Sequence, residues 1–102
     1  MLSTLNFKEL SFLVYGLGLS GQSVVKFFKK NKIKKFEVWD DKQKKLFKNK
    51  RTKNLNKALN NVDFIVLSPG ISFIEKKNLI KFEKKIITDI DFLFLTNKNF
   101  KS

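Results

Sequence analysis

The chain has 102 residues, enough for one small domain with a single hydrophobic core. It has no cysteine and no histidine, which excludes disulfide frameworks, cysteine nucleophiles, thiolate metal sites and histidine-based acid–base catalysis. Its 22 basic and 9 acidic residues give a formal net charge of +13, which would suit a nucleic-acid-binding protein. All but one of the bases are lysines spread along the chain, so we favour a solvated lysine surface and expect no specific nucleic-acid partner.

The hydropathy pattern gives no sign of a membrane protein. The longest run of apolar and glycine residues, 12–19, is much shorter than the ~20 residues that a bilayer span needs. Polar side chains interrupt the first residues, so no signal peptide is indicated. We therefore expect a cytoplasmic protein with no membrane partner.

The first half of the chain alternates short apolar segments with one amphipathic segment. Residues 11–15 form an apolar run that ends at a glycine and predict a buried strand. Residues 20–30 carry apolar side chains at helical spacing and predict a helix. Residues 35–39 alternate in polarity and predict a second strand. Residues 42–60, rich in Lys and Asn, predict one or two weak helices that join near residues 52–54.

The second half continues the alternation. Residues 63–67 are apolar on both faces, which is typical of a central strand in a parallel sheet. Residues 75–83 predict a helix, and residues 85–88 predict a fourth strand. Asp89 can then cap a last helix. The apolar residues expected to characterise this helix are Ile90, Leu93 and Phe94.

Strands that alternate with helices predict an α/β fold, a Rossmann-like parallel sheet of four or five strands with helices on both faces. We expect this domain to cover residues 1–96, followed at residues 97–102 by a tail or the start of a linker to a missing ATP-binding domain.

The glycines form the clearest motif. Gly16, Gly18 and Gly21 make a G-x-G-x-x-G pattern that follows the first strand and opens the first helix. Gly16 permits a tight turn, Gly18 lets the backbone approach a phosphate, and Gly21 lets the helix lie close to the sheet. The helix N-terminus then presents free N–H groups to an anion, and Ser20 adds a hydroxyl as a helix cap or a phosphate donor.

Two further loops follow strands of the same sheet. Asp40 ends the second strand, where an acid can bind a ribose or a base edge or can cap a helix, and Asp41 and Lys42 lie beside it. The third strand ends in Ser68-Pro69-Gly70, a rigid loop that presents backbone amides. Ligands bind outside the carboxyl ends of parallel strands, so these loops predict one site. The chain has room for half of a dinucleotide fold, which favours a mononucleotide over a complete NAD.

Three segments, taken together, resemble the N-terminal domain of the Mur ligases, and most closely the ligases that add D-glutamate. They are residues 16–21 (G-L-G-L-S-G) with Asp40 after them, residues 63–71 (D-F-I-V-L-S-P-G-I), and residues 88–91 (T-D-I-D). The resemblance implies a domain that binds the UDP part of a UDP-linked muramoyl substrate. It also implies that the chain holds no catalytic or metal-binding residue.

The resemblance also implies roles for individual residues. Gly18, Leu19 and Ser20 would hold the diphosphate. The residues implied to meet the uracil are Asp40, Asp41, Lys42, Ser68, Pro69 and Gly70. Asp89 would start the helix that borders the site.

The whole enzyme, by resemblance, would use ATP and Mg²⁺ to activate UDP-N-acetylmuramoyl-L-alanine and couple D-glutamate in peptidoglycan synthesis. This sequence has no G-x-x-G-K-[ST] loop for ATP, so we expect a monomeric domain without cofactor and without activity alone. Two alternatives remain: a stand-alone NAD(P)- or nucleotide-sensing Rossmann module, and a nucleic-acid-binding protein.

Overall fold

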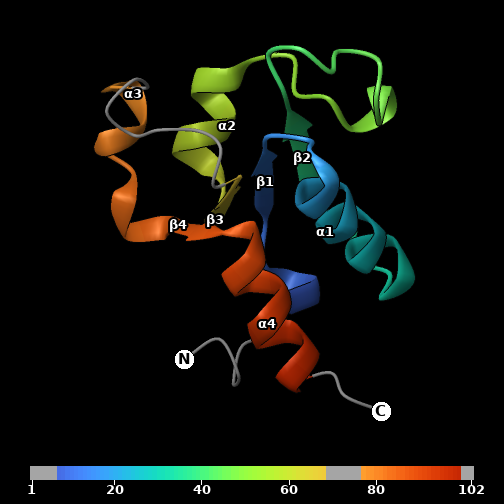
Figure 1. Cartoon of the computed structure of the whole chain (residues 1–102). Helices are drawn as coiled ribbons and strands as arrows, with labels where there is room; N and C mark the ends of the chain where they lie inside the picture. The colour runs from blue at the N-terminus through green and yellow to red at the C-terminus, as the bar shows by residue number, and fades with distance from the viewer. Residues whose placement is uncertain (1–6, 69–76, 100–102) are drawn as a thin grey trace.

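The structure, a computed structural model, describes residues 7–68 and 77–99. Four short strands alternate with helices along the chain (Figure 1). The strands are β1 (Phe12–Tyr15), β2 (Phe36–Trp39), β3 (Phe64–Leu67) and β4 (Ile86–Thr88). The α-helices are α1 (Leu19–Lys30), α2 (Leu55–Asn61), α3 (Lys77–Ile80) and α4 (Asp89–Asn99). The single-turn 3-10 helices are η2 (Phe7–Glu9), η3 (Lys48–Lys50) and η4 (Glu83–Lys85).

All four strands run parallel in the order β2-β1-β3-β4. Tyr15, the last residue of β1, pairs with Trp39 of β2 and with Leu67 of β3. Leu67 pairs in turn with Thr88, the last residue of β4. The carboxyl ends of the strands are therefore level, and the segments that follow them start along one edge. The α/β fold with a parallel sheet is confirmed.

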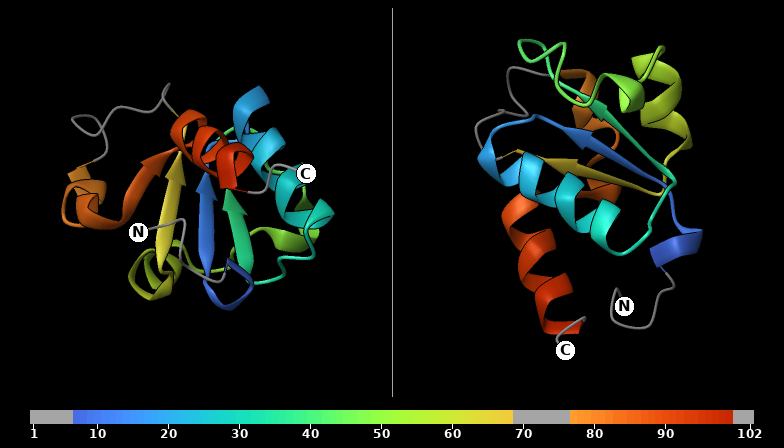
Figure 2. Two further views of the ribbon diagram at one scale, coloured as in Figure 1. Left: turned by 90° about the horizontal axis from the view of Figure 1, so that it is seen from below. Right: turned by 90° about the vertical axis from the view of Figure 1, so that its right-hand side faces the viewer.

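Helices cover both faces of the sheet. Figure 2 shows α1 and α4 on one face and α2 on the other. Alternate residues of β1 serve the two faces, because successive side chains of a strand point in opposite directions. Phe12 and Val14 join the cluster under α1 and α4, while Leu13 and Tyr15 join the cluster under α2. This double burial explains why β1 and β3 appear in the sequence as unbroken apolar runs.

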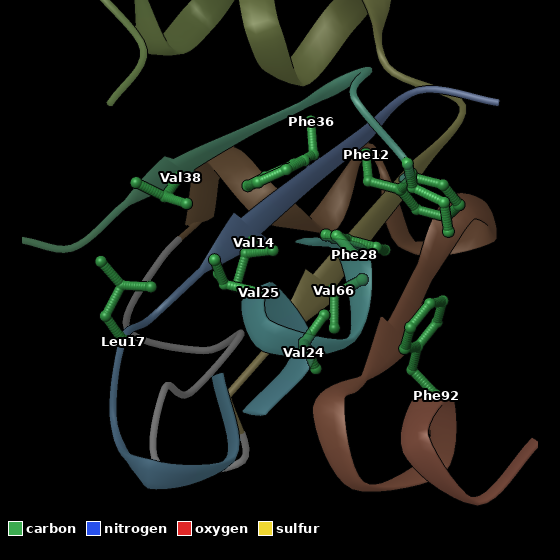
Figure 3. Close-up of a cluster of buried hydrophobic side chains, with 11 residues drawn as sticks. Phe12, Val14, Leu17, Val24, Val25, Phe28, Phe36, Val38, Val66 and Phe92 are labelled. Atoms are coloured by element: carbon green, nitrogen blue, oxygen red, sulfur yellow. The ribbon is translucent and has the colours of Figure 1, made fainter. Parts of the chain in front are cut away.

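Aromatic packing dominates the cluster under α1 and α4 (Figure 3). The Phe28 ring of α1 lies 4.9 Å, centroid to centroid, from both Phe12 and Phe36. Phe92 of α4 meets Phe12 and Phe28 edge-on at 5.7 and 5.5 Å. These rings join the two helices to β1 and β2, and such pairs contribute beyond their buried area.

Of the three apolar residues expected in α4, Leu93 packs against the core cluster, whereas Ile90 and Phe94 do not. Among the α4 side chains that the structure describes, Asp89, Phe92 and Thr96 are buried, whereas Ile90 and Phe94 are 56% and 68% exposed. Phe92 faces the core because it packs against the ring of Phe28 in α1 and the ring of Phe12 in β1. The cap is also different, since the Asp91 amide donates to the Thr88 hydroxyl at 3.1 Å. Asp89 is the first helical residue instead of the cap.

Residues 42–60 contain less helix than expected. The described structure there is η3 and α2, and the break near residues 52–54 is confirmed by the Asn54 side chain, which caps α2 by accepting from the Lys57 amide at 3.0 Å. The helix expected at residues 75–83 is described only as α3, with residues 75 and 76 outside the described ranges. None of the helices in the described ranges is long and apolar enough to cross a membrane.

Candidate functional site

The residues singled out in the sequence follow the level ends of the four strands. Asp40 follows β2, Gly16 follows β1, Ser68 follows β3 and Asp89 follows β4. The Gly16 amide donates to the Trp39 carbonyl at 2.7 Å, and the Ser68 amide donates to the Tyr15 carbonyl at 3.0 Å. These bonds continue the sheet by one step, so the first loop lies between the other two. We call this row the carboxyl edge.

The first and third glycines of the motif have the roles that their spacing predicts. Gly16 has a φ of 104°, which L side chains rarely adopt. Gly21 lies on the buried face of α1, and a Cβ built on it would clash with the carbonyl oxygen of Gly16. The turn and the helix therefore touch, backbone against backbone. A side chain at Gly21 would push them apart.

Gly18 is different. Its φ of −72° and ψ of −170° are extended backbone that any residue adopts, and a Cβ there would meet no atom of the described residues within 4 Å. The backbone conformation therefore does not itself require glycine at this position. The space above Gly18 lies at the N-terminus of α1, whose first intrahelical bond runs from the Gln22 amide to the Gly18 carbonyl at 2.9 Å. The amides of residues 19–21 have no acceptor within the helix.

The side chains at this helix start leave the amides uncovered. The N-cap, Gly18, provides no side-chain hydrogen bond, so the alternative of Ser20 as the helix cap is wrong. Ser20 is half-buried, and its hydroxyl has no partner within the described ranges. Leu19 is 86% exposed. The arrangement suits an anion held by main-chain N–H groups and one hydroxyl.

Asp40 joins the first two loops. One carboxylate oxygen accepts the Leu17 amide at 2.6 Å, and the other accepts the Lys42 and Gln43 amides at 2.7 and 2.8 Å. Burial tends to raise the pKa of Asp40, but these three donors outweigh it and hold the pKa below its ordinary value. No helix follows Asp40 directly, so the helix-cap alternative is wrong.

An arginine that the sequence analysis did not place completes this corner. Arg51 donates to the Asp40 carbonyl at 2.9 Å, and its guanidinium lies 4.1 Å from the centre of the Trp39 ring. The Trp39 indole donates in turn to the Asp41 carboxylate at 3.0 Å. The Lys42 side chain is exposed. Arg51 is the single arginine among 21 lysines, a signal that could have marked it.

Asp89 occupies the far end of the row. Its side chain is 1% exposed, and neither carboxylate oxygen has a hydrogen-bond partner within the described part of the chain. Burial raises the pKa of Asp89, although the backbone amides of Ile90 and Asp89 itself act in the opposite direction. Ser68 is half-buried and follows Leu67, which pairs with Thr88, the residue before Asp89. Pro69 and Gly70 lie outside the described residues.

The carboxyl edge brings hydrogen-bond donors and acceptors together. Among the described residues there is no group of three or more His, Cys, Asp or Glu side chains that could hold a metal ion. The groups at the carboxyl edge are amide donors, a hydroxyl and carboxylates. They can hold a phosphate and the polar edge of a base.

Comparison with known proteins agrees with the resemblance seen in the sequence. Residues 10–88 match the family described as Mur ligase MurD-like, N-terminal domain. The chain is 39% identical over 75 residues to UDP-N-acetylmuramoylalanine--D-glutamate ligase of Buchnera aphidicola subsp. Schizaphis graminum (strain Sg). That alignment covers 66% of this chain but only 17% of the relative. No solved structure gave a significant match. With β1, the glycine turn, Asp40, β3 and β4 all inside the matched range, the chain belongs to the family of Mur ligase MurD-like N-terminal domains.

Proposed function

We propose that this chain is the substrate-binding domain of a peptidoglycan-precursor ligase and holds the UDP part of UDP-N-acetylmuramoyl-L-alanine at the carboxyl edge. The observation that carries the proposal is the uncovered start of α1. It presents free amides and the Ser20 hydroxyl to open space above Gly18. Membership of the family supports a UDP-linked ligand, and the relative's name supports D-glutamate as the amino acid that the whole ligase adds.

The diphosphate would bind at Gly18, Leu19 and Ser20. The N-terminus of an α-helix carries a partial positive charge of roughly half a unit, and its free N–H groups point at the ligand. α1 has 12 residues and no acidic side chain in its first turn, so nothing of its own competes with a bound phosphate. The proposed contact with the diphosphate uses main-chain amides and the Ser20 hydroxyl, so it does not depend on the many lysines of the chain.

The uridine would lie along the row between the loops after β2 and β3. Asp40 already accepts three amides, so its carboxylate can offer the ligand only its remaining acceptor position. Asp41 and Lys42 on one side, with Ser68, Pro69, Gly70 and Asp89 on the other, would supply the further contacts. Asp89 suits this role because its buried oxygens have no protein partner within the described chain.

Catalysis belongs to the rest of the ligase. The chain spans about one-sixth of the relative's length and has no phosphate loop of the G-x-x-G-K-[ST] type. We infer that ATP, Mg²⁺ and D-glutamate bind outside these residues, in a cytoplasmic enzyme. The 102 residues alone then bind substrate weakly as a monomer and turn nothing over.

Calorimetric titration of the chain with UDP and with NAD tests the proposal. UDP should bind more tightly than NAD, because the single β-α-β-α-β half offers no second mononucleotide seat. Gly18→Val should abolish UDP binding while leaving the fold intact, because its side chain fills the open space and the backbone there accepts any residue.

A matched pair of serines provides the control. Ser20→Ala should weaken UDP binding by about 3- to 10-fold, the loss of one hydrogen bond to a charged group. Ser23→Ala should have no effect, because the Ser23 hydroxyl donates to the Leu19 carbonyl on an exposed side of α1. Tighter binding of NAD than of UDP would contradict the proposed function and favour the nucleotide-sensing module.

A further inference from the structure

The opposite edge of the sheet carries a groove of about 640 Å³. It lies at the amino ends of β1 and β2, where Phe12 and Phe36 pair, and it is bounded by residues 49–54 and by α2. Its volume falls within the range of ligand pockets. We call it the amino-edge groove. None of the residues proposed above to bind UDP lines it.

The groove is strongly positive. Lys34 and Lys35 come from the turn before β2, Lys53 precedes α2, and Lys57 lies on it. All four are exposed, and within the described ranges none of their ammonium groups has a hydrogen bond or an ion pair. Glu37 is the acidic residue among those that line the groove. Four unneutralised cations facing one concave surface form a potential that attracts anions.

The groove also runs along β2, one of the two edge strands of the sheet. β2 is the outer strand of the sheet, and its free side is bridged at Val38 by Arg51, where the Thr52 amide donates to the Val38 carbonyl at 3.1 Å. Before that bridge, Phe36 and Glu37 line the groove. The Phe36 amide is already bonded to the Lys34 carbonyl at 2.9 Å, so this part of β2 offers a ligand mainly its lysine charges and few free main-chain groups.

We propose that the amino-edge groove docks an extended acidic segment of a partner protein. The segment lies along the first half of β2, and its carboxylates face the four lysines. Lysine suits this partner because an ammonium group is a point charge that needs no planar bidentate acceptor. The proposal is independent of UDP binding, which uses the other edge.

The groove is less suited to nucleic acid. Single-stranded nucleic acids bind by stacking bases on exposed aromatic rings. The aromatic residues that line the groove, Phe12 and Phe36, are 0% and 4% exposed, so no ring is offered to a base. The Arg51 guanidinium is already stacked on Trp39.

Fluorescence polarisation of the full chain with a labelled octapeptide of alternating Asp and Glu tests the proposal. The variant K34E/K35E should weaken binding by about 10-fold or more, because close charge pairs are reversed. The control K44E/K45E makes the same change in net charge at exposed lysines outside the groove, and it should weaken binding by less than about 3-fold. K53E/K57E should behave like K34E/K35E.

Three outcomes would overturn the proposal. Equal losses in the groove and control variants would mean diffuse surface charge. Tighter binding of single-stranded oligouridylate than of the peptide, lost in K34E/K35E, would assign the groove to nucleic acid. Displacement of the peptide by saturating UDP would place the peptide at the carboxyl edge. The comparison of the groove variants with the control variant decides the proposal whether or not UDP itself binds.

Discussion

The two edges of the sheet offer anions different chemistry. At the carboxyl edge the donors are main-chain amides, fixed by the turn at Gly16 and the start of α1. At the amino edge they are lysine side chains with no partner of their own in the described structure. Backbone donors keep one geometry and select a ligand by shape, whereas mobile ammonium groups attract negative charge with little selectivity.

The edges also differ in their acids. At the carboxyl edge Asp89 is buried and Asp40 is half-buried, and Asp40 holds two loops together. Glu37 at the amino edge is exposed and has no partner within the described ranges. The carboxyl edge should therefore respond to substitution with large changes in stability. The amino edge should not.

The largest effect is expected at the contact between the glycine turn and α1. Gly21→Ala should lower the free energy of unfolding by about 3 kcal/mol, because its Cβ meets the Gly16 carbonyl oxygen. Gly18→Ala, where the Cβ meets open space, should change it by less than about 0.5 kcal/mol. Urea unfolding of the two variants measures the difference. Equal stability of both would show that the helix does not lie against the turn.

The next largest effect is expected at Asp40. Asp40→Ala should lower the free energy of unfolding by about 2 kcal/mol, since three amides lose a charged acceptor. Because folding lowers the pKa of Asp40, its contribution is present above the ordinary carboxyl pKa and is lost as pH falls through the folded value, below about pH 4. Urea unfolding of the wild type and Asp40→Ala between about pH 2 and about pH 7 tests both the size of the loss and its pH dependence.

The amino-edge carboxylate provides the control for Asp40. Glu37→Ala should leave the free energy of unfolding within about 0.5 kcal/mol of the wild type. If Glu37→Ala were as destabilising as Asp40→Ala, the two edges would not differ in the way described.

Asp89 should show the opposite pH dependence. Folding raises the pKa of Asp89, so its stabilising contribution is complete below the ordinary carboxyl pKa and declines as pH rises through the folded value. Asp89→Asn should therefore raise stability at pH 7 by about 1 kcal/mol, since no buried charge remains. Thermal unfolding of the wild type and the variant at about pH 4 and about pH 7 measures this gain in stability. Asp91→Asn, an exposed neighbour, should not reproduce the gain, and a loss of stability in Asp89→Asn would contradict the prediction.

The smallest effect is expected where the segment after η3 meets β2. Arg51→Lys should cost about 0.5 kcal/mol, because lysine replaces the stacked guanidinium and its bond to the Asp40 carbonyl. Trp39 is the single tryptophan, so its fluorescence emission should shift in this variant. Lys53→Ala, two residues on and exposed, should leave the emission unchanged, and an equal shift in both would contradict the assigned contact.

The fold was largely predictable because its signals are local. Buried parallel strands require apolar residues on both faces, which makes β1 and β3 visible as continuous runs. The turn at Gly16 and the close contact at Gly21 both demand glycine, so their spacing identifies the strand–helix junction. The identity of the loops at the carboxyl edge follows from the parallel topology.

What escaped prediction depends on partners distant in sequence. Asp40 accepts the Leu17 amide from 23 residues away, and periodicity carries no information about that contact. In α4, apolar residues lie on all sides, so helical periodicity does not show whether Phe92 or Phe94 faces the core. Phe92 does so because it packs against the rings of Phe12 and Phe28. Arg51 reaches β2 by a bridge to Val38 across a segment without regular pattern.

Mapping UDP onto the chain by ¹⁵N–¹H correlation spectra tests the central claim most directly. If the carboxyl edge is the nucleotide site, UDP should shift the amide signals of residues 18–21, of residues 40–43 and of Ser68, and leave those of residues 34–37 and 49–54 unmoved. Shifts concentrated at residues 34–37 and 49–54, with an unchanged glycine turn, would contradict it. The nucleotide would then bind the lysines of the amino-edge groove and not the N-terminus of α1.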